Sequence, residues 1–114
     1  MEIKSEDYQV TCDPDPPTVV FRGALRLRGA AEYAPIVQLL DDIVAAAPET
    51  ATLNLRDLRF LNSSGINVLF RFVIKVREQS STQLVVLGSE MVPWQGKSLK
   101  NLQRLMPSLQ LEME

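Results

Sequence analysis

Two kinds of hydrophobic spacing alternate along the chain. In some stretches every second residue is apolar, which is typical of a half-buried β-strand, and in others apolar residues recur every three or four positions, which is typical of an amphipathic helix. Their alternation predicts an α/β domain with the element order β-β-α-β-α-β-α-β. The expected strands lie at residues 8–12, 18–23, 52–56, 84–87 and 109–113, and the expected helices at residues 34–47, 64–79 and 99–106.

Prolines mark the ends of these elements. Residues 13–17 include three prolines, which lack the N–H that a strand interior requires, so this segment should be the turn of a hairpin between the first two strands. Pro35 is expected in the first turn of the first helix, where a missing N–H costs little, so that helix should begin near Ala34. Pro48 and Pro107 should end the first and last helices.

The hydrophobic core should form between the second helix and the sheet. Residues 84–87 are an uninterrupted apolar run, which indicates a central strand of a mixed or parallel sheet, whereas residues 109–113 alternate as in a half-exposed edge strand. Helices that link consecutive strands by right-handed crossovers lie on the same side of the sheet. The residues expected to share one core are Ile66, Leu69, Val73 and Val76 of the helix, with Leu53, Leu55, Val85 and Leu87 of the strands.

The composition is that of an ordinary globular domain. The 114 residues, 46% hydrophobic and 23% charged, are enough for one domain with a buried core, expected to span residues 1–114. The net charge of −2 gives no electrostatic reason to expect nucleic acid or an anionic membrane as a partner. A charged N-terminus, the lack of a long apolar run and the single cysteine, Cys12, favour a cytoplasmic protein.

Little in the sequence supports an enzyme. Without histidine, the chain cannot form a Ser-His-Asp or Cys-His catalytic arrangement, or a zinc site built on histidine. Residues 96–98, Gly-Lys-Ser, resemble the end of a phosphate-binding loop, but Met91 stands where that loop requires a glycine. These residues are therefore interpreted as a loop leading into the last helix. No catalytic residue, metal or cofactor is expected.

The most informative segment is residues 53–69, LNLRDLRFLNSSGINVL, which should run from a strand through a tight polar turn into a helix. Ser63, Ser64 and Gly65 lie where this helix should begin. The start of a helix has unpaired N–H groups and a partial positive charge, so it accepts either a serine side chain as a cap or a phosphate group. Ser63 is a candidate for both roles.

This segment resembles the signature of the STAS domain, the fold of bacterial anti-sigma factor antagonists. In that family a strand of the type L-D-L-x-x-L-x-F-[IL]-D-S-S-G runs into a helix. The topology predicted above is compatible with the family over nearly the whole chain. The resemblance implies a STAS-like single domain, with a mixed sheet of about five strands and helices packed mainly on one face.

The resemblance also implies a non-catalytic function in partner-switching signal transduction that regulates transcription. The first serine of the pair is phosphorylated in the family, so the phosphorylation site would be Ser63 and, less favourably, Ser64. The kinase would be an ATP-dependent anti-sigma factor or switch kinase, and a serine phosphatase would reverse the modification. Asn62 is a departure, because the family usually has an acidic residue there.

An alternative keeps the fold without the phosphorylation. Serine is a favoured helix N-cap, so Ser63 could serve only as a cap in a STAS-like scaffold or sensor domain for protein–protein interaction. Asn62 supports this alternative, because it lacks the charge that the family places beside the serine.

The start of the second helix should face a protein partner. Phe70 and Phe72 lie beside core positions, and adjacent helix positions diverge by about 100°, so one of the two should be exposed for an apolar contact. Trp94, before the last helix, is expected to pack on the domain, with a role as an interface anchor as the alternative. The residues expected to face a partner are Asn62, Ser63, Ser64, Gly65, Asn67, Phe70 and Arg71.

Overall fold

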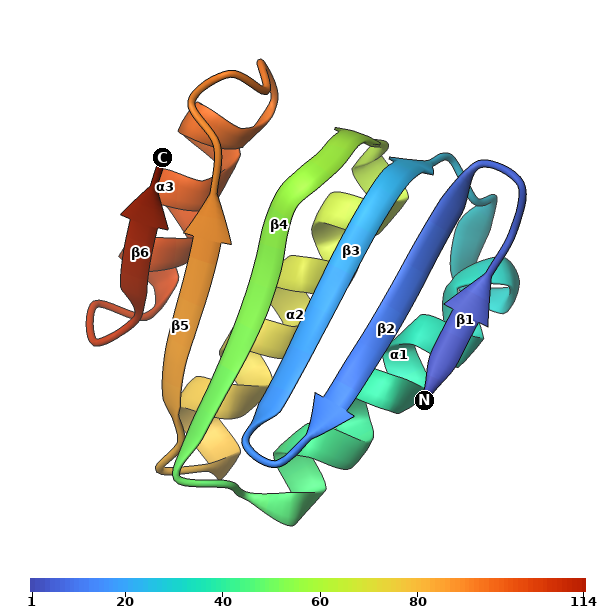
Figure 1. The fold of residues 1–114 in the computed structure, drawn as a ribbon. Coiled ribbons are helices and arrows are strands. Elements are labelled where there is room, and N and C mark those ends of the chain that lie inside the picture. The colour runs from blue at the N-terminus through green and yellow to red at the C-terminus, as the bar shows by residue number, and fades with distance from the viewer.

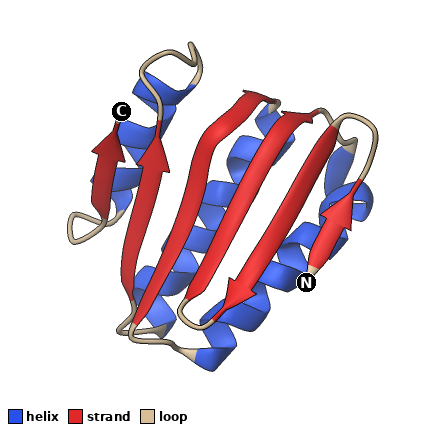
Figure 2. Ribbon diagram, in the orientation of Figure 1, coloured by secondary structure: helices blue, strands red, loops and turns tan.

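The computed structural model describes residues 1–114, which form a six-stranded β-sheet with three helices on one of its faces (Figure 1). Figure 2 shows the two layers, with the strands in front of the helices. The predicted α/β class, mixed sheet and one-sided helices are confirmed. In chain order the elements are β1 (Glu2–Lys4), β2 (Tyr8–Pro14), β3 (Pro17–Leu25), α1 (Gly29–Ala46), β4 (Thr50–Leu61), α2 (Ser63–Gln79), β5 (Gln83–Gly88), α3 (Gln95–Leu105) and β6 (Gln110–Met113).

The strands lie in the sheet in the same order as in the chain. β1, β2 and β3 pair antiparallel, and β3 to β6 pair parallel. Each parallel connection contains one helix, as a crossover between parallel strands requires. The sheet has six strands where about five were expected. The additional strand, β1, has only three residues, too few for an alternating pattern to be recognised.

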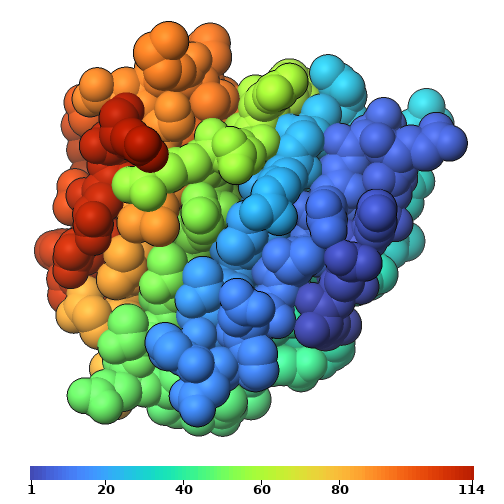
Figure 3. Space-filling model, viewed as in Figure 1, coloured from blue at the N-terminus to red at the C-terminus, as the bar shows by residue number.

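The core lies between the helices and one face of the sheet. The two β4 residues predicted for the core are buried, but Val85 and Leu87 of β5 are only half-buried, and Leu84 and Val86 are buried instead. The prediction for β5 was wrong because an uninterrupted apolar run does not show which of its residues face the helices. Val85 and Leu87 lie on the opposite face, which no helix covers and which Figure 3 views.

The apolar stripe of α2 packs on the sheet as predicted. Leu69, Val73 and Val76 are at most 3% exposed, and Ile66 is half-buried at the edge of the core. The spacing of three and four residues therefore predicted which face of α2 packs on the sheet.

Helix α1 begins earlier than predicted. Its start was expected near Ala34 because Pro35 was placed in the first turn, but the helix begins at Gly29 and contains Pro35 in its interior. A proline there removes the hydrogen bond to the carbonyl of Ala31, four residues earlier. Ala31 and Pro35 are both exposed, so water can replace the missing donor and the helix continues through the proline.

Strand β4 is longer than predicted, because its pairing with β3 continues through two bulges as far as Leu61. Its pairing with β3 shifts by one residue between Asn54 and Asp57 and again between Leu58 and Phe60. A bulge inserts one unpaired residue and so reverses the alternation of side chains along the strand. As a result, Leu58 and Leu61 are both buried, whereas Phe60 is 41% exposed.

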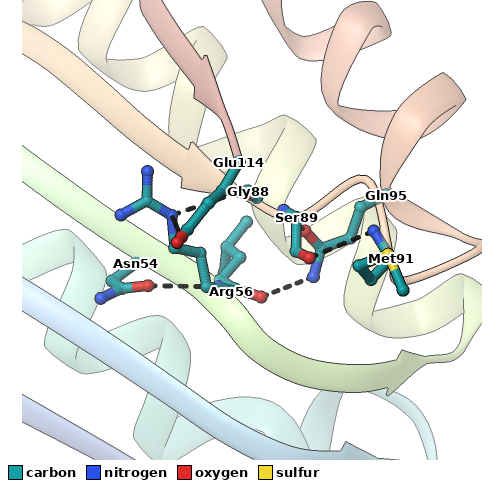
Figure 4. A network of polar contacts seen from close by, with 8 residues as sticks. Asn54, Arg56, Gly88, Ser89, Met91, Gln95 and Glu114 are labelled. Carbon is teal, nitrogen blue, oxygen red and sulfur yellow. Dashed lines mark hydrogen bonds and ion pairs between the residues drawn. The ribbon is translucent and has the colours of Figure 1, made fainter.

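A buried glutamine connects the carboxyl half of β4 to the loop before α3. β4 pairs with β5 only along its first half, and the two strands separate beyond it (Figure 1). Gln95 is fully buried; its Nε2 donates to the carbonyls of Leu55 and Leu58, and its Oε1 accepts the N–H of Ser89 at 2.7 Å (Figure 4). Trp94 packs beside it and donates to the Leu58 carbonyl at 2.9 Å. These side chains replace the ladder partners that β4 lacks there.

Candidate functional site

The sequence motif lies at the carboxyl ends of β3 and β4, where α2 begins (Figure 1). β4 ends at Leu61 and α2 starts at Ser63, so Asn62 alone connects them. Ser63 is exposed, whereas Ser64 is half-buried. The hydroxyl of Ser63 is therefore at the surface, in the first turn of the helix.

Asn62, and not Ser63, caps α2, which corrects the interpretation of Ser63 as the cap. Its Oδ1 accepts the N–H of Gly65 at 3.0 Å and the hydroxyl of Tyr33 at 2.7 Å, while its Nδ2 donates to the Leu27 carbonyl at 2.8 Å. One amide thus joins α2, α1 and the segment after β3. A carboxylate could not donate to Leu27, so the departure from the family pattern has a structural role.

Tyr33 contributes a buried hydroxyl to this network. Its side chain is 1% exposed, and the hydroxyl lies 2.7 Å from Asn62 Oδ1 and 3.5 Å from the Leu25 carbonyl. Burial raises the pKa of the Tyr33 phenol above its ordinary value of 10.0, and a backbone hydrogen bond lowers this pKa to a smaller extent. The phenol is therefore a protonated donor at neutral pH.

Replacing Tyr33 with phenylalanine should lower the free energy of unfolding by about 1–2 kcal/mol at neutral pH, because Asn62 loses a donor. Since the folded-state pKa is raised, the contribution of the Tyr33 hydroxyl is fully present below the ordinary value of 10.0 and is lost as pH rises through the folded-state value. Urea unfolding of both proteins at about pH 8 and about pH 11 measures this dependence. A stability difference that stays the same at both pH values would contradict the expectation.

Gly65 allows α2 to approach its neighbours closely. A Cβ at this position would lie 2.6 Å from the hydroxyl oxygen of Tyr33 and would collide with the side chain of Leu61. Gly65 is buried against both residues. The glycine of the motif is therefore explained by packing at the start of the helix.

A groove runs between α1 and α2 beside the motif and has a volume of about 380 Å³. It brings together three of the residues expected to face a partner, Ser64, Asn67 and Arg71. Asn67 and Arg71 are exposed. The other lining residues are Gly29, Ala30, Tyr33, Ala34, Val37, Gln38 and Val68.

The exposed aromatic residue of this region is not the one expected. Phe72 is buried and Phe70 is half-buried against the core, so neither is exposed as predicted. Phe60 is exposed instead, with the guanidinium of Arg26 at 4.6 Å from the centre of its ring. The alternation of β4 gave no sign of this, because the second bulge that turns Phe60 outward cannot be read from the pattern.

The remaining features offer no site of their own. Residues 96–98 lie within α3, which begins at Gln95, and not in a loop before it. No group of three or more potential metal-ligating side chains comes together. Burial raises the pKa of the Cys12 thiol, which disfavours the reactive thiolate. None of the three helices is both long and apolar enough to span a bilayer.

Neither a family model nor a curated protein sequence matches this chain. Solved structures do match, over almost all of its length. One is a chain from the complex of the diguanylate cyclase SiaD with its activator SiaC from Pseudomonas aeruginosa, with a TM-score of 0.72, 10% identity, and coverage of 100% of this chain and 99% of that chain.

Two further structures have the same fold. SiaC of Pseudomonas aeruginosa matches with a TM-score of 0.71 and 12% identity, over 100% of this chain and 96% of that chain. An anti-sigma factor antagonist from Mycobacterium paratuberculosis matches with a TM-score of 0.65 and 20% identity, over 95% of this chain and 90% of that chain. The expected likeness in fold to an anti-sigma factor antagonist is confirmed, and the chain has a STAS-like fold.

Proposed function

We propose that this chain is a non-catalytic regulator that binds a protein partner through the start of α2 and is controlled by phosphorylation of Ser63. The partner would be an ATP-dependent anti-sigma factor or switch kinase, with a serine phosphatase to reverse the modification. The observation that carries the proposal is the exposed Ser63 hydroxyl in the first helical turn of a fold shared with an anti-sigma factor antagonist. A kinase of this kind uses cellular ATP, so the proposal places the chain in the cytoplasm.

The local geometry suits both states of the serine. The side chain of Asn62 already caps α2, so the hydroxyl of Ser63 is not needed for that purpose. A phosphoserine carries about −1.5 to −2 charges, which the positive end of a helix stabilises. Phosphorylation should therefore leave the domain folded and change the charge that a partner meets.

The direct test is phosphorylation by purified kinases. Wild type and Ser63→Ala are incubated with Mg-ATP and each ATP-binding serine kinase of the anti-sigma type encoded in the same genome, and their intact masses are measured. One phosphate on wild type and none on Ser63→Ala is expected. If Ser63→Ala still gains a phosphate and it maps to Ser64, the phosphorylation site is Ser64. If no kinase modifies wild type, the proposal is overturned.

Thermal or urea unfolding of Ser63→Ala serves as the control for this experiment. Because Asn62 is the cap, the substitution should change the free energy of unfolding by less than about 0.5 kcal/mol. A larger loss would mean that Ser63 supports the helix after all.

Ser63→Asp should weaken binding to the kinase that modifies wild type by about tenfold, because it places a charge at the proposed interface. The variant should still fold, since a carboxylate is favourable at the start of a helix. Titration calorimetry compares it with wild type, Ser63→Ala and the matched control Ser81→Asp, which adds the same charge to an exposed loop. Equal affinity of all four proteins would place Ser63 outside the interface.

The catalysis would belong to the partner, so this chain alone should neither bind nor hydrolyse ATP. The residues that resemble a phosphate-binding loop, 96–98, lie on α3, and its Lys97 is exposed. Phosphate release is measured for purified wild type and for Lys97→Ala. ATP turnover that persists through purification and disappears in Lys97→Ala would overturn this part of the proposal.

A second candidate is the activation of an enzyme by binding without phosphorylation, as in a scaffold or sensor domain. It is favoured by the match over the full chain to structures with SiaC, whose partner SiaD is a diguanylate cyclase. Its test is cyclic di-GMP production by the diguanylate cyclases of the same genome, with and without this chain. A rise in production that Ser63→Ala retains would favour this candidate.

A further inference from the structure

Arg71 is an uncompensated charge in the groove between α1 and α2. Its side chain is exposed and takes part in none of the ion pairs of the structure. A smaller hollow of about 70 Å³ continues from Arg71 towards Asp41 and Lys75. These two residues pair with each other at 2.7 Å, so Asp41 is already engaged and Arg71 has no carboxylate partner within the chain.

Half of the ten residues that line the groove are hydrophobic, and the polar ones besides Arg71 are Gln38, Ser64 and Asn67. The groove is also wide enough for side chains of another molecule. Its volume of about 380 Å³ falls within the range of about 300–1,000 Å³ that is typical of binding pockets. On α1, Ala30 and Ala34 leave room because their side chains are small, and the groove is also lined by Val37 of α1 and Val68 of α2. Both alanines are exposed, so the groove is open to an approaching protein segment.

The groove lies next to the proposed phosphorylation site. Ser64 lines it and directly follows Ser63. A segment lying in the groove would therefore pass close to the start of α2, and a phosphate on Ser63 would add negative charge at the mouth of the groove.

We infer that this groove receives an apolar segment of the protein partner that carries an aspartate or glutamate, whose carboxylate pairs with Arg71. The inference rests on the proposed function for the existence of a partner, and it adds what the partner must present. It also gives phosphorylation an effect on binding, because a phosphate on Ser63 would add negative charge beside the groove that the partner's carboxylate has to enter.

The first experiment does not depend on knowing the partner. A displayed library of random twelve-residue peptides is selected on immobilised wild type, Arg71→Glu, and the matched control Arg104→Glu, which reverses an exposed charge on α3. Wild type and Arg104→Glu should enrich apolar peptides with at least one aspartate or glutamate, and Arg71→Glu should lose them. Enrichment that is absent from wild type, that lacks acidic residues, or that Arg71→Glu retains would overturn the inference.

Filling the groove provides a second, uncharged test. Ala34→Trp should lower the affinity of a selected peptide by about tenfold, whereas Ala31→Trp, an exposed residue of α1 outside the groove, should not. Equal loss in both variants would contradict the inference. Sedimentation of wild type at rising concentration tests whether the groove binds a second copy of this chain. Self-association that Arg71→Glu abolishes would show this, and would also overturn the inference.

The kinase assays above separate this inference from the proposed function. If wild type is phosphorylated on Ser63 and Arg71→Glu binds the same kinase as tightly as wild type does, the inference fails and the proposed function stands. If no kinase modifies Ser63 but acidic peptides bind in a manner that requires Arg71, the groove is a docking site and the phosphorylation proposal fails.

Discussion

Leu69→Ala is expected to lower the free energy of unfolding by about 2–5 kcal/mol, because it removes a side chain from the packed layer between α2 and the sheet. Leu69 is 3% exposed and belongs to the single core cluster of the domain. Domains of this kind are stable by about 5–15 kcal/mol in total, so the variant should retain only part of its stability. Urea unfolding followed by circular dichroism measures the change.

Arg71→Ala is the matched control for Leu69→Ala, since Arg71 lies on the same helix but is exposed. It should change stability by less than about 0.5 kcal/mol. A similar small loss in both variants would mean that α2 does not rest on the sheet through Leu69.

Asn62→Leu is expected to destabilise the domain by about 2–4 kcal/mol, because it removes the cap of α2 and leaves two polar groups without their partner. These groups are the hydroxyl of Tyr33 and the carbonyl of Leu27. Asn62→Asp keeps the acceptor for Gly65 and Tyr33 and loses only the donor to Leu27, so it should cost about 0.5–1.5 kcal/mol. Urea unfolding of the two variants gives the ranking.

Asn67→Leu, an exposed position on the same helix, is the control for these substitutions and should be close to wild type in stability. If Asn62→Asp is as destabilising as Asn62→Leu, the cap contributes little and the bond to Leu27 carries the effect. If neither differs from wild type, the network does not hold the start of α2.

The elements with strong periodicity were predictable, whereas the phase of β5 was not. The stripe of α2 gave Leu69 and Val73 correctly, because three- and four-residue spacing defines one face of a helix. The apolar run in β5 contains no polar residue that marks the outward side, so burial of Leu84 and Val86 had to come from the structure.

The motif predicted where α2 begins, but the hydrogen bonds of Asn62 could not be predicted from the sequence. The run of Asn62, Ser63 and Ser64 marked the start of a helix in the sequence. The partners of Asn62 come from Tyr33 and Leu27, which only the fold brings near it. Asparagine and serine are about equally favoured as helix N-caps, so local propensity could not decide between Asn62 and Ser63, and the structure shows that Asn62 is the cap.

The order of the strands in the sheet matches their order in the chain, and this has a consequence for how the protein folds. Every strand after the first pairs with the strand that precedes it, so no pairing has to wait for a distant part of the chain. The segment between two paired strands contains at most one helix, and the entropic cost of closing such a loop grows only slowly with its length. A nascent chain could therefore extend its sheet strand by strand as the ribosome releases it.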